Sequence, residues 1–262
     1  MSDRDRTQLR HSAPANNINT STPESLSEYS GEEVLLRRYR VMGTCGTGGF
    51  GTVLACWDTR LQRRVAIKRM PLSTPEYGID DQVSTSTINE ALSEARTASR
   101  LEHPNIVDVH DFEVEGNTAY LVMEYIDGVS LSELLERVEG GTLTHDEVAY
   151  LVQELGNALE FAHHNGVLHL DIKPSNIIFT RDGCVKLCDF GMATLASAAG
   201  YADARGGTIG YMPPEQIEGK LVDERTDLFS LAVVVLDALI GKNSLIPAHP
   251  GHSLALHEPG TQ

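Results

Sequence analysis

Residues 169–176 read His-Leu-Asp-Ile-Lys-Pro-Ser-Asn, and thirteen positions after the last of them the chain reads Asp189-Phe190-Gly191. Asp171 therefore stands five residues before Asn176, with a second carboxylate close behind them in the chain. One carboxylate can orient a hydroxyl nucleophile while the other, with the amide oxygen, ligates Mg²⁺ beside a phosphate chain. A strand, turn and strand with solvated carboxylates is the alternative. The spacing favours a site that holds metal and phosphate.

A glycine-rich stretch lies far upstream and reads Gly46-Thr47-Gly48-Gly49-Phe50-Gly51-Thr52-Val53. Glycines let backbone amides approach phosphate without interference from a Cβ. A dinucleotide-binding fingerprint would open a helix, whereas this stretch joins two apolar segments that are typical of strands. The glycine-rich stretch alone does not define a nucleotide site. It indicates one only in combination with the acidic residues at 171–189.

Composition limits the class of protein. The chain has 262 residues, 41% of them hydrophobic, which suits one large domain or two modest ones. The net charge is −16, and the first 40 residues hold six basic and six acidic groups, so the remainder carries the whole acidic excess and argues against a nucleic-acid partner. The four scattered cysteines indicate a reducing compartment. No apolar run reaches the roughly 18 residues of a membrane span, and the polar N-terminus is no signal peptide, so we expect a soluble cytoplasmic protein.

Strand patterns fill the first half of the chain. Two strands flank the glycine-rich stretch, a third is expected at residues 65–68, and a hairpin at residues 106–112 with 118–124. A capping box opens a helix at residues 87–101. We therefore predict a five-stranded antiparallel sheet with one helix for residues 39–124.

The second half of the chain reads as helical. Capping boxes open helices at about residues 130–138 and 144–165, and an apolar helix is expected at 227–240. His163 and His164 end the second of these helices, where an interaction with the helix dipole explains them. Polar, Pro- and Gly-containing sequence at both ends of the chain predicts a disordered tail at residues 1–30 and a flexible tail at residues 246–262.

In this order, the motifs resemble the protein kinase family, and within it the eukaryotic-like serine/threonine kinases of bacteria. The resemblance covers residues 39 to about 245, and Lys173-Pro174 and Gly207-Thr208 resemble the serine/threonine-directed members. It implies an α+β, two-lobed fold with an N-lobe at residues 39–124 and a mainly helical C-lobe at residues 125–245. That C-lobe would be incomplete, because its last helices are missing.

The resemblance also implies catalytic roles. Asp171 would accept the proton of a substrate hydroxyl, and Lys173 would neutralise charge on the moving γ-phosphoryl group. Asn176 and Asp189 would hold Mg²⁺.

Lys68, at the end of the third strand, would contact the phosphates of ATP. Glu94 is its expected ion-pair partner on the helix, while Glu90, one turn earlier, is the alternative partner. A solvated strand-end lysine is the alternative interpretation of Lys68.

A larger set would bind the nucleotide. Met123 would lie beside the adenine, although a plain core residue would look the same, and the backbone of Glu124 and Ile126 would pair with the base. The full set that the resemblance implies is Gly46, Thr47, Gly48, Gly49, Phe50, Gly51, Val53, Ala66, Lys68, Met123, Glu124 and Ile126.

Two departures from the family pattern affect what we expect. Leu170 stands where many members have an arginine that grips an activation-loop phosphate, so activity should not depend on such a phosphate through that contact. Glu215 lacks the downstream arginine that pairs with it in the family, and the apolar residues Leu231, Val235 and Leu239 should lose a covering layer. A truncated chain, or a partner chain that covers the incomplete C-lobe, would account for the second departure.

Three functions are therefore compared. The first, which we favour, is an ATP- and Mg²⁺-dependent kinase that phosphorylates Ser/Thr hydroxyls of proteins. The second is a non-catalytic, nucleotide-binding kinase remnant that acts as an interaction module. The third is a small-molecule phosphotransferase, against which stand the full glycine-rich stretch, Lys173-Pro174 and the closing Pro214-Glu215.

Overall fold

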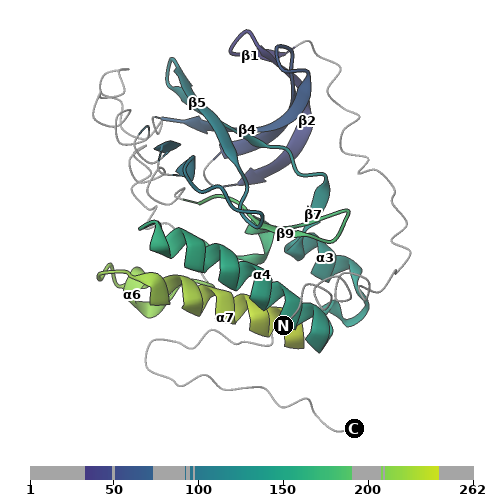
Figure 1. Cartoon of the computed structure of the whole chain (residues 1–262), viewed down its shortest axis with the longest axis vertical. Helices are drawn as coiled ribbons and strands as arrows, with labels where there is room; N and C mark the ends of the chain where they lie inside the picture. The colour runs from purple at the N-terminus through teal and green to yellow at the C-terminus, as the bar shows by residue number, and fades with distance from the viewer. Residues whose placement is uncertain are drawn as a thin grey trace, which may run out of the picture.

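A β-rich lobe stacks on a helical lobe in the computed structural model of the chain (Figure 1). The described residues are 33–48, 51–72, 92, 95–96, 98–190, 208 and 210–241. The predicted α+β, two-lobed architecture is confirmed. The two predicted tails lie outside the described residues, as does most of the predicted helix at 87–101, of which residues 92, 95–96 and 98 are helical.

The sheet of the β-rich lobe has six strands in the order β1-β2-β3-β4-β6-β5, and every neighbouring pair is antiparallel. The sequence predicted five strands and missed the first one, β1. This strand is too short to show an alternating pattern. The chain reverses between β1 and β2 through Leu36 and Arg37, both with positive φ. The strands are β1 Val34–Leu35, β2 Tyr39–Gly48, β3 Gly51–Asp58, β4 Arg63–Pro71, β5 Val109–Glu115 and β6 Thr118–Glu124.

The hairpin of β5 and β6 begins later than predicted. Its first strand starts at Val109, not at Ile106. Ile106 instead forms an isolated parallel bridge with Leu187 of the other lobe. The apolar run 106–107 therefore belongs to the contact between the lobes, a role that local periodicity does not distinguish from a strand.

Alternation along β6 divides the core of this lobe between two faces of the sheet. Tyr120 and Val122 pack on one face, with Leu54 and Ile67. Ala119, Leu121 and Met123 pack on the opposite face, together with Ala66 and the helical residue Ala95. Residues of β4 and β6 that point to this second face are thereby brought to one side of the sheet.

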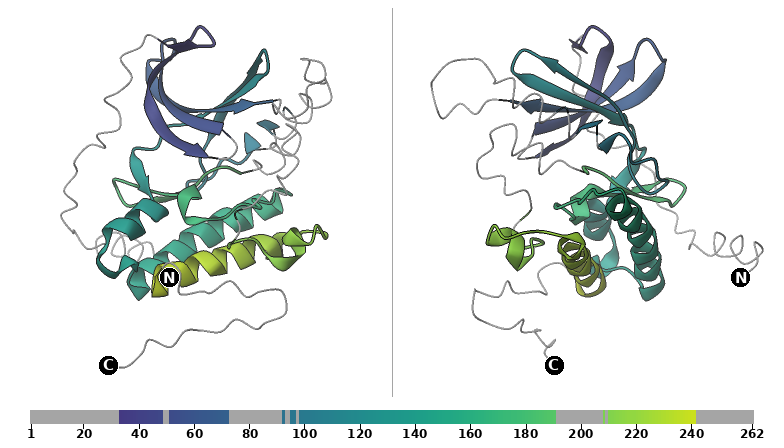
Figure 2. Two further views of the ribbon diagram at one scale, coloured as in Figure 1. Left: turned by 180° about the vertical axis from the view of Figure 1, so that it is seen from behind. Right: turned by 60° about the vertical axis from the view of Figure 1, so that its left-hand side comes forward.

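Helices α4 and α7 lie side by side beneath the sheet (Figures 1 and 2) and bury a common core with the small sheet β7-β8-β9. The predicted capping boxes are confirmed at Ser130 with Glu133 and at Thr144 with Glu147. Helix α7 begins at Glu224, earlier than the predicted residue 227, because Asp223 caps it. The elements are β7 Gly128–Ser130, α3 Leu131–Arg137, the 3-10 turn Glu139–Gly141, α4 His145–His164, the 3-10 turn Pro174–Asn176, β8 Ile177–Thr180, β9 Val185–Leu187, α6 Pro214–Ile217 and α7 Glu224–Ile240.

Among the residues that the structure describes, none of the helices combines the length and the apolar character needed to cross a membrane.

Asp58, at the end of β3, is a buried acidic residue of the sheet with a charged partner. It is 1% exposed and receives two hydrogen bonds from the Arg38 guanidinium, at 3.0 and 2.7 Å. The Arg38 hydrogen bonds lower the pKa of Asp58 to about 2, against the opposing effect of burial. Because the folded-state pKa is below the unfolded value of about 3.9, this stabilisation is present above pH 4 and is lost as the pH falls towards 2.

Asp58→Asn should lower the free energy of unfolding by about 2 kcal/mol at pH 6, since it removes one member of a shielded, bidentate pair. Asp111→Asn is the matched control, because the Asp111 carboxylate lies 3.8 Å from Arg38 and is 41% exposed. Urea unfolding at pH 6 and at pH 3 measures both effects. Equal stability of wild type and Asp58→Asn at pH 6 would contradict this account.

Candidate active site

The loop that carries Asp171 is anchored by Asp227 of α7. The Asp227 carboxylate is fully buried and accepts the backbone N–H of His169 and of Leu170, each at 2.8 Å. Leu170 has φ +63°, a strained conformation for a residue with a side chain, so the two hydrogen bonds hold a backbone shape that is costly in isolation. Asp227 therefore anchors the backbone of the loop that carries Asp171.

His163 has a more specific role than an interaction with the helix dipole. Its Nε2 lies 2.8 Å from Asp227 Oδ2, so α4 contributes a third contact to the same buried carboxylate. The contact joins residues 64 positions apart. Helical periodicity places His163 at the end of α4 but does not show which element packs there.

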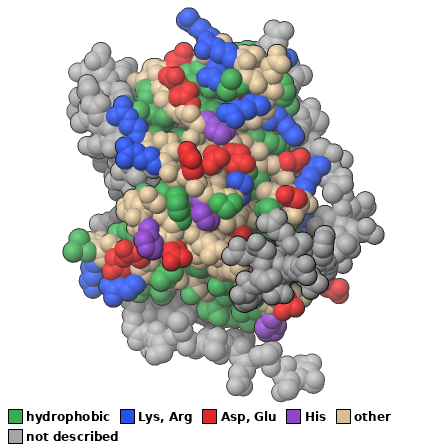
Figure 3. Space-filling view, in the orientation of Figure 1, with side chains coloured by type: hydrophobic (Ala, Val, Ile, Leu, Met, Phe, Trp, Pro, Cys, Tyr) green, Lys and Arg blue, Asp and Glu red, His purple; other side chains and the backbone are tan. Residues whose placement is uncertain are grey.

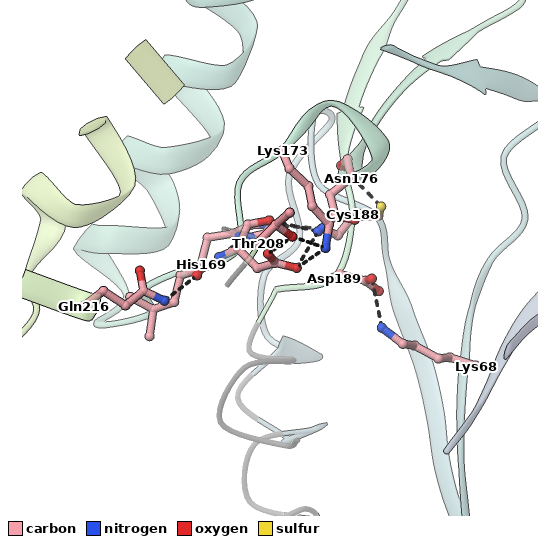
Figure 4. Close-up of polar contacts among 10 residues, drawn as sticks. Lys68, His169, Lys173, Asn176, Cys188, Asp189, Thr208 and Gln216 are labelled. Carbon is pink, nitrogen blue, oxygen red and sulfur yellow. Dashed lines mark hydrogen bonds and ion pairs between the residues drawn. The ribbon is translucent and has the colours of Figure 1, made fainter. Parts of the chain in front are cut away.

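Asp171 belongs to a polar cluster with Lys173, Asn176 and Thr208, three residues that Figure 4 labels. Its Oδ2 lies 2.7 Å from Lys173 Nζ, and its Oδ1 accepts the Thr208 hydroxyl at 3.1 Å. Lys173 Nζ also donates to Thr208 Oγ1 at 2.8 Å, and the Asn176 amide donates to the Asp171 carbonyl at 2.8 Å. Asp171, Lys173 and Asn176 are thus together, as predicted. Thr208 is a site residue that the sequence marked only as part of the Gly207-Thr208 motif.

Lys68 and Asp189 meet across the two lobes. Lys68 Nζ, on β4, lies 2.8 Å from Asp189 Oδ2, and Lys68 is only 5% exposed. Burial disfavours the charged form of Asp189, but the adjacent Lys68 ammonium outweighs it and lowers the pKa of the carboxyl below its ordinary value. Asp189 is therefore an ionised carboxylate, the form that a metal ligand requires.

The predicted partner of Lys68 on the helix is not among the described residues. Glu94 and the alternative Glu90 both lie outside them, so the Lys68–Glu94 pair stays a prediction. Burial of Lys68 shows that it is not a solvated strand-end lysine.

His169 joins the loop that carries Asp171 to the segment that carries Asp189. One ring nitrogen lies 2.9 Å from the Cys188 carbonyl, and the other accepts the Asp171 N–H at 3.2 Å. The ring also lies edge-on to Phe190, with centroids 4.6 Å apart. His169 is fully buried, and its contacts fix Asp171 and Asp189 relative to one another. The sequence placed His169 in the motif without showing this bridging role.

Apolar residues that were predicted to contact the base do lie together. Val53, Ala66, Met123 and Ile126 belong to one cluster, which also includes Cys188, the residue after β9. The Glu124 N–H donates to the Asp108 carbonyl at 2.9 Å. The backbone N–H of Glu124 is thus paired within the protein, and pairing of the Glu124 carbonyl with a base stays a prediction.

In the glycine-rich stretch, Gly51 is required by its surroundings. It has φ +130°, and a Cβ at this position would lie 2.2 Å from the Arg69 carbonyl oxygen. Gly46, Thr47 and Gly48 form the end of β2, while Gly49 and Phe50 lie outside the described residues. The tight approach of β3 to β4 therefore explains one glycine, and the remaining ones keep their predicted role in phosphate binding.

Polar contacts tie residues 211–216 to α7 and to the loop that carries Asp171. Glu215 is half-buried and accepts the Thr226 hydroxyl at 3.1 Å, so the expectation of an unpaired buried carboxylate was wrong. The Tyr211 hydroxyl donates to Asp237 at 2.6 Å, and the Gln216 amide donates to the Leu170 carbonyl at 2.9 Å. Hydroxyl and amide donors thus hold this segment.

The oxygen donors at the site suit Mg²⁺. Within the described ranges, no group of three or more His, Cys, Asp and Glu side chains is arranged to hold a metal ion. Mg²⁺ does not need such a cage, because it commonly takes one or two protein oxygens and completes its shell with water and phosphate. The Asp189 carboxylate and the Asn176 amide oxygen are hard donors of this kind.

Comparison with known proteins identifies relatives of this arrangement. The protein kinase domain family model matches residues 39–256. The chain is 39% identical to the serine/threonine-protein kinase PknA of Mycobacterium tuberculosis over 212 residues, which cover 78% of this chain and 47% of PknA. It is 34% identical to the serine/threonine-protein kinase PrkC of Bacillus subtilis over 207 residues, which cover 78% of this chain and 31% of PrkC.

A solved structure has the same fold. The kinase domain of PknI from Mycobacterium tuberculosis superimposes with a TM-score of 0.65 and 26% sequence identity, covering 87% of this chain and 82% of that domain. The chain spans about half the length of PknA, or less in the case of PrkC. The family match, the identities and the shared fold lead to one conclusion: the chain belongs to the protein kinase family.

Proposed function

We propose that the chain is a serine/threonine protein kinase that transfers the γ-phosphoryl group of ATP to Ser and Thr hydroxyls of proteins. The cluster of Asp171, Lys173 and Thr208 is the observation that carries the proposal. It places a carboxylate, a cation and a hydroxyl within hydrogen-bonding distance of one another. Asp189 lies next to this cluster (Figure 4).

The proposed reaction follows from these groups. The Asp171 carboxylate orients the substrate hydroxyl and accepts its proton as the oxygen forms a bond to the γ-phosphorus and the bond to ADP breaks. Lys173 stabilises the negative charge on the transferring group. A substrate hydroxyl would take the place that the Thr208 hydroxyl occupies on Asp171 in this structure.

The nucleotide would lie between the lobes. Lys68 binds its phosphates, and Val53, Ala66, Met123 and Ile126 cover the adenine. Asn176 and Asp189 would hold Mg²⁺, which neutralises phosphate charge when bound. All four cysteines are free thiols, which supports a reducing, cytoplasmic location.

Transfer of labelled phosphate from ATP to a generic protein substrate, followed by analysis of the phosphorylated amino acids, tests the proposal. We expect label on serine and threonine and none on tyrosine. Label on tyrosine alone would contradict the substrate class. Binding of ATP without any transfer would favour the non-catalytic alternative.

One observation favours that alternative, an interaction module with a partner chain. Leu228, Phe229 and Ile240 of α7 are 52%, 40% and 44% exposed, and Figure 3 shows hydrophobic side chains on the surface of the helical lobe. Exposed apolar patches commonly mark interaction surfaces. The residues expected to lose a covering layer were different ones: Leu231 is buried in the core of this lobe, and Val235 and Leu239 are partly buried against it. We propose that a partner chain covers this face of α7.

A further inference from the structure

A shielded ion pair joins the strand that leads to Asp189 with the segment between the lobes. Lys186 lies on β9, and its Nζ is 2.8 Å from Oε2 of Glu124, the last residue of β6. The same ammonium donates to the Ile106 carbonyl at 3.4 Å. The two side chains are 15% and 31% exposed, so water screens this pair less than a surface pair.

The β9 end of this ion pair is fixed by backbone bonds that do not involve the Lys186 side chain. Leu187 accepts the Val107 N–H at 3.0 Å and donates its own N–H to the Asn105 carbonyl at 2.8 Å. The Cys188 N–H donates to the Asn176 carbonyl at 2.9 Å. Loss of the lysine charge should therefore leave the segment that carries Asp189 in place.

The Glu124 end is held differently. Residues 125–127 lie between β6 and β7 and belong to neither ladder, and at the far end of this segment the Asp127 carbonyl accepts the Arg181 N–H at 3.3 Å. The backbone directly after Glu124 therefore depends more on side-chain contacts. The Lys186 ammonium supplies such a contact to Glu124 itself. Asp127 has contacts with Arg181 at 3.1 Å and Arg64 at 3.8 Å, but all three side chains are between 41% and 59% exposed. Exposed pairs of this kind contribute little.

We propose that Lys186 is a positioning residue for the nucleotide: through its ion pair with Glu124, it fixes the backbone carbonyl that accepts the adenine amino group. The inference rests on the proposed function and concerns only the adenine end of the site. Lys68, Asn176 and Asp189 serve the phosphate end. Lys186 acts through Glu124 and not by contact with the nucleotide, so its removal should affect the two ends unequally.

Two ligands separate the two ends experimentally. Adenosine contains the base without phosphates, and tripolyphosphate with Mg²⁺ contains the phosphates without the base. In Lys186→Met we expect the affinity for adenosine to fall about three- to tenfold. This effect is larger than that of losing an exposed ion pair and smaller than that of breaking a fully buried one. We expect the affinity for Mg²⁺-tripolyphosphate to stay within about twofold of wild type, because β9 keeps its backbone bonds.

Three further variants complete the test. Asp127→Asn is the matched control, a half-exposed acid in the same segment, and should leave adenosine binding unchanged. Glu124→Gln should reproduce the effect of Lys186→Met. The double variant Lys186→Glu with Glu124→Lys restores the ion pair with the charges exchanged and should recover most of the adenosine affinity. Its affinity still tests the inference if thermal melting shows that one of the single variants is unfolded.

Each result decides between positioning and general stabilisation. Equal weakening of both ligands in Lys186→Met would show a structural role only and overturn the inference. So would unchanged adenosine binding in both single variants. If wild type bound neither adenosine nor Mg²⁺-tripolyphosphate, the proposed function itself would fail, and that outcome is visible before any variant is made.

Discussion

Asp171→Asn should reduce phosphoryl transfer about a thousandfold while nucleotide binding stays intact. A positioned general base contributes roughly a hundredfold to ten-thousandfold, and asparagine cannot accept the proton of the substrate hydroxyl. The substitution preserves size and one hydrogen-bond acceptor, so the contacts with Lys173 and Thr208 at Asp171 need not all be lost. The rate under saturating ATP and protein substrate measures the effect.

The control for Asp171→Asn is Asp182→Asn. Asp182 lies exposed in the turn between β8 and β9, where it accepts a hydrogen bond from the Thr180 hydroxyl. It has no part in the proposed reaction. Its rate should match that of wild type. An Asp171→Asn variant that is folded and retains more than about a tenth of the wild-type rate would contradict the assignment of Asp171 as the base.

Asp189→Asn should abolish the Mg²⁺ dependence of ATP binding and lower transfer by a hundredfold to a thousandfold, the order of magnitude of a lost charge-stabilising group. The substitution removes the carboxylate that would ligate the metal, and it leaves the buried Lys68 ammonium without the partner at 2.8 Å. Titration of the variant with ATP, with and without Mg²⁺, gives the first quantity, and the transfer assay gives the second.

Lys68→Met provides the comparison for Asp189→Asn. It removes the other member of the pair but no metal ligand, so ATP binding should weaken while still responding to Mg²⁺. The same response in both variants would mean that Asp189 acts only as the counter-ion of Lys68, and the metal role would have to be abandoned.

Much of the candidate site was predictable because several of its residues lie close together in short sequence motifs. Asp171, Lys173 and Asn176 lie within six positions of the chain, and the structure brings them into one cluster. The capping boxes at Ser130 and Thr144 were predictable for a similar reason, since both partners lie within one helical turn.

The remaining features depend on contacts between distant segments. His163 and Asp227 are 64 positions apart, and nothing in the periodicity of α4 indicates the pairing. Strand β1 is two residues long, which is below the length at which alternation is visible. The Thr226 contact of Glu215 was missed because the family pattern directs attention to an arginine, whereas a hydroxyl on the next helix suffices.

The most direct test is a calorimetric titration of the purified wild-type chain with ATP, in the presence and in the absence of Mg²⁺. If Lys68, Asn176 and Asp189 form one nucleotide site, ATP should bind with one-to-one stoichiometry, and Mg²⁺ should strengthen binding on the order of tenfold. A chain that melts cooperatively but binds ATP under neither condition would contradict the account.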